Sequence, residues 1–194
     1  MINKSALENI FIKGKYGNFV DKKDSELLKI SEIKNQIIYQ LARFSNSNYD
    51  YSQIKIDDLN LPTTLKTSFN NQTRINWMGP NNWMIVSSNQ SVKNDLNNQL
   101  LNKEFAVTDL SHSRTIIEIE GKEAFEVIKK GSPLNLNNIQ DGNCANSIYH
   151  GINVTIDFIS SRPQKIRLYS LRSFGESFYE SITDASLEFG YLVV

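Results

Sequence analysis

The stretch that decides the predicted fold is residues 107–136, VTDLSHSRTIIEIEGKEAFEVIKKGSPLNL. Apolar and polar residues alternate over 105–110 and again over 114–120, which is the pattern of half-buried β-strands. From Gly121 the pattern changes to a helical one, with Lys and Glu on the outer face, and Gly131 ends it. The stretch therefore predicts strand, turn, strand and helix.

The sequence on either side extends this order into two similar halves. After the first of these elements, the expected order is strand, helix, strand, strand, helix and strand, at 114–120, 121–131, 148–159, 166–170, 173–190 and 191–194. This is the split βαβ, or ferredoxin-like, order. The preceding region predicts strands at 74–78 and 83–87, a polar helix from Ser91 to about Leu101, and the strand at 105–110. We therefore expect an α+β fold of two ferredoxin-like halves with antiparallel sheets.

The first 72 residues have a weaker pattern. Residues 5–17 are compatible with one short helix closed by a glycine, and 28–44 fits both a strand and a helix period. Residues 45–72 are rich in Asn, Ser, Asp and Thr, which predicts a loop-rich connection. We expect residues 1–72 to pack on a main α+β region at 73–194, as one compact unit.

Composition excludes several classes of protein. The chain has 194 residues, of which 40% are hydrophobic and 22% charged, and its 21 Lys and Arg balance 21 Asp and Glu. Without a basic excess, binding to nucleic acid or to an anionic membrane surface is not expected. One cysteine and two histidines offer no disulfide and no spacing typical of a zinc site. No apolar run reaches the ~20 residues of a membrane helix, and no signal peptide is recognisable, so the expected location is the cytoplasm.

Ser111-His112-Ser113-Arg114 is the strongest candidate for chemistry. A catalytic interpretation requires His112 as a base, an activated serine, and a carboxylate such as Asp109 to orient the ring. Neighbouring residues of an extended chain point to opposite faces, so Ser111 and His112 diverge unless the turn brings them together. The alternative, which we favour, is a turn whose side chains bond to the backbone, with Asp109 as a turn residue.

The other candidates also have a structural interpretation that we favour. Trp77 and Trp83 flank a Gly-Pro turn. Three interpretations are open for them: they fill a core, which we favour, they anchor a partner, or they stack on a flavin or pterin ring. We interpret Cys144 as a buried inert thiol and His150 as a half-buried ring. Helix termination explains Gly131-Ser-Pro133, and neither glycine-rich phosphate motif occurs. The sequence leaves open whether Arg114 and Arg172 pair with carboxylates or face solvent.

Several spaced motifs resemble the gamma subunit family of heterotetrameric sarcosine oxidase. They follow one another along nearly the whole chain: Ser5-Ala-Leu, Lys13-Gly-Lys-Tyr-Gly17, Trp77-Met-Gly-Pro-Asn-Asn-Trp-Met-Ile-Val86, Asp109-Leu-Ser-His-Ser-Arg114, Gly131-Ser-Pro-Leu-Asn-Leu136, Gly142-Asn-Cys-Ala145 and Arg172-Ser-Phe-Gly-Glu-Ser-Phe178. The resemblance implies a fold like the folate-binding domain of the glycine-cleavage T-protein. Residues 18–70 carry the least of it.

The resemblance also implies partners and a role. The expected partners are an alpha subunit with nicotinamide and folate sites, a beta subunit with FAD and covalently held FMN, and a zinc-binding delta subunit. That complex oxidatively demethylates sarcosine to glycine, with tetrahydrofolate accepting the methyl carbon when it is present. In this family the flavin and substrate chemistry is not assigned to the gamma subunit.

We therefore expect a non-catalytic structural subunit, with no catalytic, cofactor-binding or metal-binding residue of its own. FAD, FMN, NAD, zinc and tetrahydrofolate are expected on the other subunits. Two alternatives stay open at this point. One is a gamma-like subunit of a related N-methyl amine dehydrogenase, and the other is a stand-alone folate-dependent one-carbon enzyme.

Overall fold

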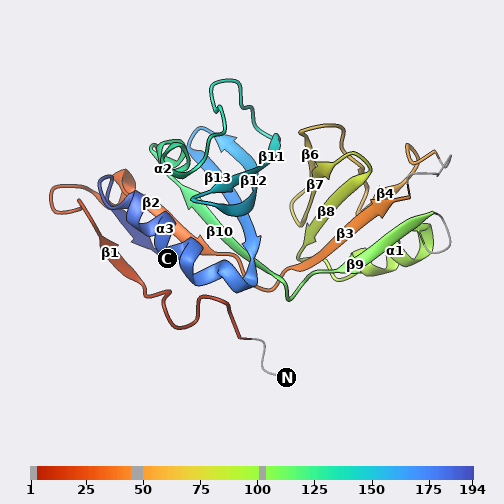
Figure 1. Ribbon diagram of the computed structural model, residues 1–194, viewed down its shortest axis with the longest axis horizontal. Helices are drawn as coiled ribbons and strands as arrows, with labels where there is room; N and C mark the ends of the chain where they lie inside the picture. The colour runs from red at the N-terminus through yellow and green to blue at the C-terminus, as the bar shows by residue number, and fades with distance from the viewer. Residues whose placement is uncertain (1–3, 45–49, 101–103) are drawn as a thin grey trace. The chain divides into compact units, whose positions relative to one another are not determined.

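The computed structural model describes residues 4–44, 50–100 and 104–194 (Figure 1). The chain divides into two compact units. Unit 1 consists of residues 1–34, 113–141 and 146–194, and unit 2 consists of residues 35–112 and 142–145. Residue 72, the last of the N-terminal part expected from the sequence, lies in the turn of a hairpin between β6 (Thr67–Phe69) and β7 (Thr73–Gly79), inside unit 2.

Unit 1 is built on a seven-stranded sheet in the order β1-β14-β2-β10-β13-β12-β11. Its strands are β1 (Gly14–Tyr16), β2 (Leu28–Glu32), β10 (Arg114–Glu120), β11 (Cys144–Tyr149), β12 (Ile152–Ser161), β13 (Gln164–Leu171) and β14 (Tyr191–Val193). Its helices are α2 (Ala124–Gly131) and α3 (Gly175–Ser186), with short 3-10 turns at Asp24–Glu26 and Arg172–Phe174. The two helices pack on each other and on the central strands.

The predicted split βαβ order is present in this unit. Along the chain it runs β10, α2, β12, β13, α3 and β14, and in the sheet these four strands lie in the order β14, β10, β13, β12 once the inserted β2 is set aside. β10 pairs antiparallel with both β13 and β2, whereas β14 runs parallel to β2. A strand from the N-terminal region therefore completes a ferredoxin-like sheet.

Unit 2 repeats the same plan around a five-stranded antiparallel sheet. The order is β6-β7-β8-β3-β9, with β3 (Ile37–Arg43), β8 (Asn82–Ser87) and β9 (Phe105–Asp109) completing it. Helix α1 (Val92–Leu100) joins β8 to β9, as predicted. Its apolar stripe packs in a core with one face of the sheet, and the members include Val92, Leu96, Leu100, Leu41, Ile75, Trp83 and Ile85.

The first crossover of unit 2 departs from the ferredoxin plan. In place of a helix after β3, the described part of the connection contains the hairpin of β4 (Lys55–Ile56) and β5 (Leu59–Asn60). Ile54 and Ile56 from this segment are buried in the same core as α1. The composition of 45–72 predicted a loop-rich connection, and its described part contains the short strands β4, β5 and β6 between irregular segments; residues 45–49 lie outside the described part of the chain.

Two sequence-based expectations need correction, over 5–17 and 148–159, and one ambiguity, over 28–44, is resolved. Residues 6–10 form turns and 14–16 form β1, so the helix expected over 5–17 is wrong. The ambiguous region 28–44 consists of two strands, β2 and β3. The strand expected over 148–159 is interrupted at His150 and Gly151, whose φ angles of 45° and 84° make a two-residue hairpin turn between β11 and β12.

Gly131 shows how closely α2 packs on the sheet. It is the last residue of the helix, and a Cβ there would lie 2.5 Å from Cζ of Tyr149, a fully buried side chain. The Tyr149 hydroxyl donates a 3.0 Å hydrogen bond to the Val127 carbonyl, which fixes the ring against the helix. The sequence explains this glycine as a helix stop, but the structure gives it a packing role.

We predict that Gly131→Ala lowers the free energy of unfolding by about 1–3 kcal/mol, because the added methyl group overpacks a ring that cannot move away. Urea unfolding followed by circular dichroism measures this change. Lys129→Ala is the matched control on the exposed face of the same helix, where the Lys129–Glu126 ion pair is solvent-exposed. We expect a change of at most about 0.5 kcal/mol there. An unchanged midpoint for Gly131→Ala would contradict the packing role.

Candidate functional site

Asp109 and Ser111 form a closed turn at the end of β9. The Asp109 carboxylate accepts hydrogen bonds from the Ser111 backbone N–H (2.9 Å) and from the Ser111 hydroxyl (2.6 Å). Ser111 Oγ also accepts a 2.9 Å bond from the Ile38 backbone N–H. The Ser111 hydroxyl bond is the main reason that the pKa of Asp109 lies below its ordinary value, followed by the backbone bond. These contacts lock β9 to β3.

This geometry differs from that of a base and its nucleophile. The proton of the Ser111 hydroxyl points to the Asp109 carboxylate, and within the described ranges no hydrogen bond joins this hydroxyl to His112. His112 itself is exposed. The SHSR stretch also spans the boundary of the two units, because residues 111 and 112 belong to unit 2 and residues 113 and 114 to unit 1.

Arg114 and Arg172, the two arginines that the sequence left open, bond to oxygen atoms of the chain itself. The half-buried guanidinium of Arg114 donates to the carbonyl and the hydroxyl of Ser113, both at 3.3 Å, and burial lowers the pKa of this side chain. The Arg172 guanidinium donates to the Lys4 carbonyl, while the Arg172 backbone N–H donates to the Ser113 carbonyl at 2.9 Å. Arg172 thus joins the N-terminal segment and the start of β10 at one end of the seven-stranded sheet, whereas the Arg114 guanidinium bonds to the residue that precedes it.

The two tryptophans lie opposite each other on β7 and β8 in the core of unit 2. Trp83 is 2% exposed, its indole N–H donates a 2.9 Å bond to the Pro62 carbonyl, and its ring lies 5.4 Å from that of Tyr51. Trp77 is partly buried and packs on the same cluster. Of the three interpretations, the core position is the one that the structure shows.

The predicted burial of Cys144 is confirmed, whereas the predicted half-burial of His150 is wrong. Cys144 is buried, with Sγ 3.1 Å from the Lys66 carbonyl oxygen and 3.4 Å from that of Trp77. Its lack of reactivity stays a prediction. His150 is exposed, because it occupies the first position of the β11–β12 turn, and its ring packs edge-on against Tyr149. The half-buried ring expected from the sequence is therefore wrong.

A ladder of charged side chains lies on one face of the seven-stranded sheet and was not predicted from the sequence. Glu118 and Glu120 of β10 lie opposite Arg167 and Lys165 of β13, and Lys29 of β2 lies opposite Glu120 on the other side. Ion pairs join Arg167 Nε to Glu118 (2.7 Å), Lys165 to Glu118 (3.0 Å) and to Glu120 (2.8 Å), and Lys29 to Glu120 (3.8 Å).

The alternation of charge was visible in both strands as Glu118-x-Glu120 and Lys165-x-Arg167. What the sequence did not contain was the register that sets them opposite each other. The bond from Lys165 is the first cause of the lowered pKa of Glu120. Carboxylates and cations nearly balance along this ladder, so its contacts are those of a structural network.

Two wider features of the described residues bear on function. Among residues 4–44, 50–100 and 104–194, no three His, Cys, Asp or Glu side chains gather in a way that would hold a metal ion. In the same part of the chain, no helix has both the length and the apolar character needed to cross a membrane.

We predict that Asp109→Asn lowers the free energy of unfolding by about 0.5–1.5 kcal/mol at pH 7, because it weakens a hydrogen bond made by a charged acceptor. The folded-state pKa of Asp109 is depressed, so this stabilisation is complete above the unfolded value of about 4 and disappears as the pH falls through the folded value. Urea unfolding at pH 7 and at successively lower pH below about 4 should show a difference that shrinks as the pH falls. Asp21→Asn, at an exposed site of unit 1, is the control; a difference that persists in acid would count against the turn.

The fold has counterparts among solved structures. A chain of the heterotetrameric sarcosine oxidase from Corynebacterium sp. U-96, solved in complex with pyrrole 2-carboxylate, is similar with a TM-score of 0.81 and 18% identity, covering 97% of each chain. The glycine cleavage system aminomethyltransferase T from Bartonella henselae is similar with a TM-score of 0.57 and 11% identity, covering 82% of this chain and 46% of that one. At these identities the two likenesses show the fold alone.

The family follows from the sequence. A comparison with curated proteins gives no match. The family model described as "Sarcosine oxidase, gamma subunit family" matches residues 48–188, which is most of the chain and includes the whole of the stretch at 107–136. This chain therefore belongs to the sarcosine oxidase gamma subunit family.

Proposed function

We propose that this chain is the gamma subunit of a heterotetrameric sarcosine oxidase, the complex that oxidatively demethylates sarcosine to glycine. The observation that carries the proposal is the family match over residues 48–188. The likeness to a chain of a heterotetrameric sarcosine oxidase supports it, because the two folds correspond over 97% of both chains.

Within that complex, the proposed role is structural and not catalytic. The support comes from the candidate residues themselves. The Ser111 hydroxyl is bonded to Asp109 and Ile38, the Trp83 indole to Pro62, and the Arg172 guanidinium to Lys4. Each of these groups is engaged in holding the fold, so we assign no catalytic, cofactor-binding or metal-binding residue to this chain.

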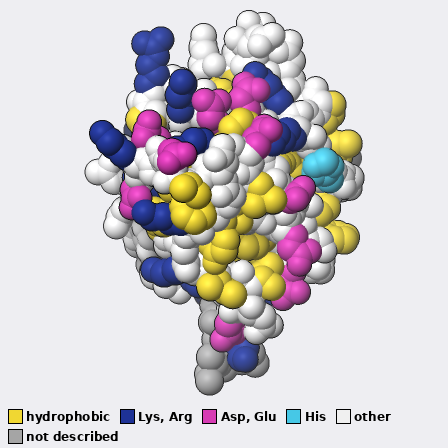
Figure 2. Space-filling view, turned by 90° about the vertical axis from the view of Figure 1, so that its left-hand side faces the viewer, with side chains coloured by type: hydrophobic (Ala, Val, Ile, Leu, Met, Phe, Trp, Pro, Cys, Tyr) yellow, Lys and Arg dark blue, Asp and Glu magenta, His cyan; other side chains and the backbone are white. Residues whose placement is uncertain are grey.

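The proposed partners are the alpha, beta and delta subunits, which would carry NAD, FAD, FMN, zinc and tetrahydrofolate. We place the complex in the cytoplasm. Figure 2 shows hydrophobic side chains gathered among charged ones on one side of the molecule. A groove of unit 1 is lined by Ile10, Ile12, Tyr16, Tyr179 and Tyr191, and Ile12 is 64% exposed. Tyr179 and Tyr191 are buried, so the accessible apolar surface of this groove comes from the exposed Ile12 and the partly buried Ile10 and Tyr16. Apolar and aromatic surface is typical of subunit interfaces, which supports a role in assembly.

Two alternative functions differ from the proposed one in substrate or in role. A gamma-like subunit of a related N-methyl amine dehydrogenase would share the fold and the structural role, but its complex would act on a different N-methyl amine. A stand-alone folate-dependent one-carbon enzyme has the support of the likeness to aminomethyltransferase T, of which this chain matches less than half. Fold likeness is a weak warrant for activity, so we rank this last.

We predict that the natively expressed chain co-purifies with three other subunits, and that the isolated complex oxidises sarcosine and shows flavin absorbance. Affinity purification through this chain, followed by mass spectrometry and an oxidase assay, measures this. Deleting its gene should lower the recovery of the assembled complex. Recovery of the chain as a lone monomer, with sarcosine oxidation unchanged in the deletion strain, would refute the proposal. A complex that prefers another N-methyl amine would favour the dehydrogenase.

We predict that tetrahydrofolate does not bind the isolated chain at low micromolar concentration. Trp77 and Trp83 provide the fluorescence signal, because Trp83 lies in the core of unit 2 and the partly buried Trp77 packs against that core. Aminomethyltransferase T serves as the positive control. Saturable quenching of this chain at low micromolar ligand would promote the one-carbon enzyme over the structural subunit.

A further inference from the structure

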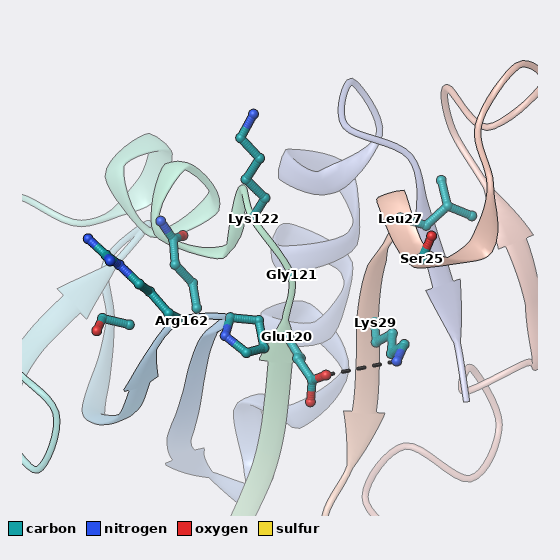
Figure 3. A pocket seen from close by; sticks show the side chains of 10 residues that line it. Ser25, Leu27, Lys29, Glu120, Gly121, Lys122 and Arg162 are labelled. Atoms are coloured by element: carbon teal, nitrogen blue, oxygen red, sulfur yellow. Dashed lines mark ion pairs between the residues drawn. The ribbon is translucent and has the colours of Figure 1, made fainter.

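A pocket of about 480 Å³ opens on unit 1 at one end of the seven-stranded sheet (Figure 3). Its residues come from three segments: residues 25–29 at the start of β2, residues 120–122 between β10 and α2, and the β12–β13 hairpin at 161–164. Leu27 and Pro163 add apolar surface. The volume falls in the range of small-molecule sites, roughly 300–1,000 Å³.

The pocket has a charge that the whole chain lacks. Lys29, Lys122 and Arg162 line it together with one carboxylate, Glu120, which leaves an excess of two positive charges. The chain as a whole has a formal net charge of zero. The three cations belong to three different segments, and Figure 3 shows them on different sides of Gly121.

Little of this positive charge is neutralised locally. The Glu120 carboxylate pairs closely with Lys165 of the ladder, at 2.8 Å, and more distantly with Lys29 of the pocket, at 3.8 Å. Lys122 is within 3.9 Å of Glu123, and its side chain is 92% exposed, so solvent screens that pair strongly. Within the described part of the chain, no ion pair engages the Arg162 guanidinium.

The two carboxylates of the 24–26 turn, Asp24 and Glu26, bond to groups that do not line the pocket. Asp24 pairs with Lys15 at 2.5 Å, and the Glu26 carboxylate accepts a 2.8 Å bond from the Lys23 backbone N–H. The backbone around the pocket is also engaged, since the Gly121 N–H donates to the Gln164 carbonyl at 2.9 Å. The ligating groups that remain available are therefore cationic side chains and the hydroxyls of Ser25 and Ser161.

We propose that this pocket binds a small dianion through its phosphate or carboxylate oxygens. Arg162 presents a planar set of donors that suits two oxygens of one anionic group, and the charges of Lys29 and Lys122 raise the positive potential around the pocket. Leu27 and Pro163 accommodate a short carbon body. This inference does not depend on the proposed subunit role, because it rests only on the groups of unit 1.

Isothermal titration calorimetry of the full chain with inorganic phosphate and with succinate tests the proposal and separates the two sources of anionic oxygens. We expect one-to-one binding of at least one probe at millimolar concentration or tighter, weaker in 200 mM than in 20 mM sodium chloride because salt screens the exposed charges. Arg162→Ala should weaken the binding by about tenfold, since a hydrogen bond to a charged group is removed. Arg162→Lys should retain part of it.

Lys129→Ala is the matched control, because Lys129 is an exposed lysine of α2 whose partner is Glu126 and which does not line the pocket. It should bind the probe as the unaltered chain does. Circular dichroism verifies that each variant is folded. Absence of binding by both probes below about 10 mM, or equal affinity of Arg162→Ala and the unaltered chain, would overturn the proposal.

Discussion

The structure of unit 1 depends on the register in which β10 pairs with β13 and β2. Ile117 and Ile119 lie opposite Leu168 and Ile166, so these four apolar side chains share the face on which α2 and α3 pack. The same register sets Glu118 and Glu120 opposite Arg167 and Lys165 on the other face. A shift of one residue would turn the carboxylates into the core and the isoleucines out of it. Because an unpaired buried charge costs several kcal/mol, the ladder and the core select the same pairing.

The two units differ in the elements that cover one face of each sheet. Both have the ferredoxin-like strand order, and in both a helix between two strands covers one face of the sheet. Unit 1 uses helices for both of its crossovers and inserts β2 between β14 and β10. Unit 2 uses α1 for one crossover and, in the described part of the other, buries Ile54 and Ile56 from a short hairpin segment. Burial of apolar surface against the sheet is what each crossover must supply, and a helix is only one means of supplying it.

The side chains that the sequence offered as candidates for function take part in contacts within the fold. In the described part of the chain, the Ser111 hydroxyl, a candidate nucleophile, is bonded to Asp109 and Ile38, and the Trp83 indole, a candidate for ring stacking, is bonded to Pro62. Such contacts stabilise a scaffold whose proposed value to the complex lies in its surfaces. The cationic pocket beside Gly121 differs from these contacts, because three cationic side chains line it together with a single carboxylate, Glu120, which also pairs with Lys165. A neutral chain that concentrates positive charge in one cavity has the electrostatics of an anion site.

The sequence by itself determined the local elements and the order in which they follow one another. The alternation over 114–120, the helical pattern ending at Gly131, and the stripe of Val92, Leu96 and Leu100 are periodicities that neighbouring residues create, and the structure contains each element. The spaced motifs of the family were also readable. Only the tertiary structure decided what depends on residues far apart in the chain. It placed Tyr149 against Gly131, joined β2 to β10, set the charged ladder in register, and brought Lys29, Lys122 and Arg162 to one pocket. Periodicity carries no information on which strands pair or in what register, since burial across the whole sheet selects that.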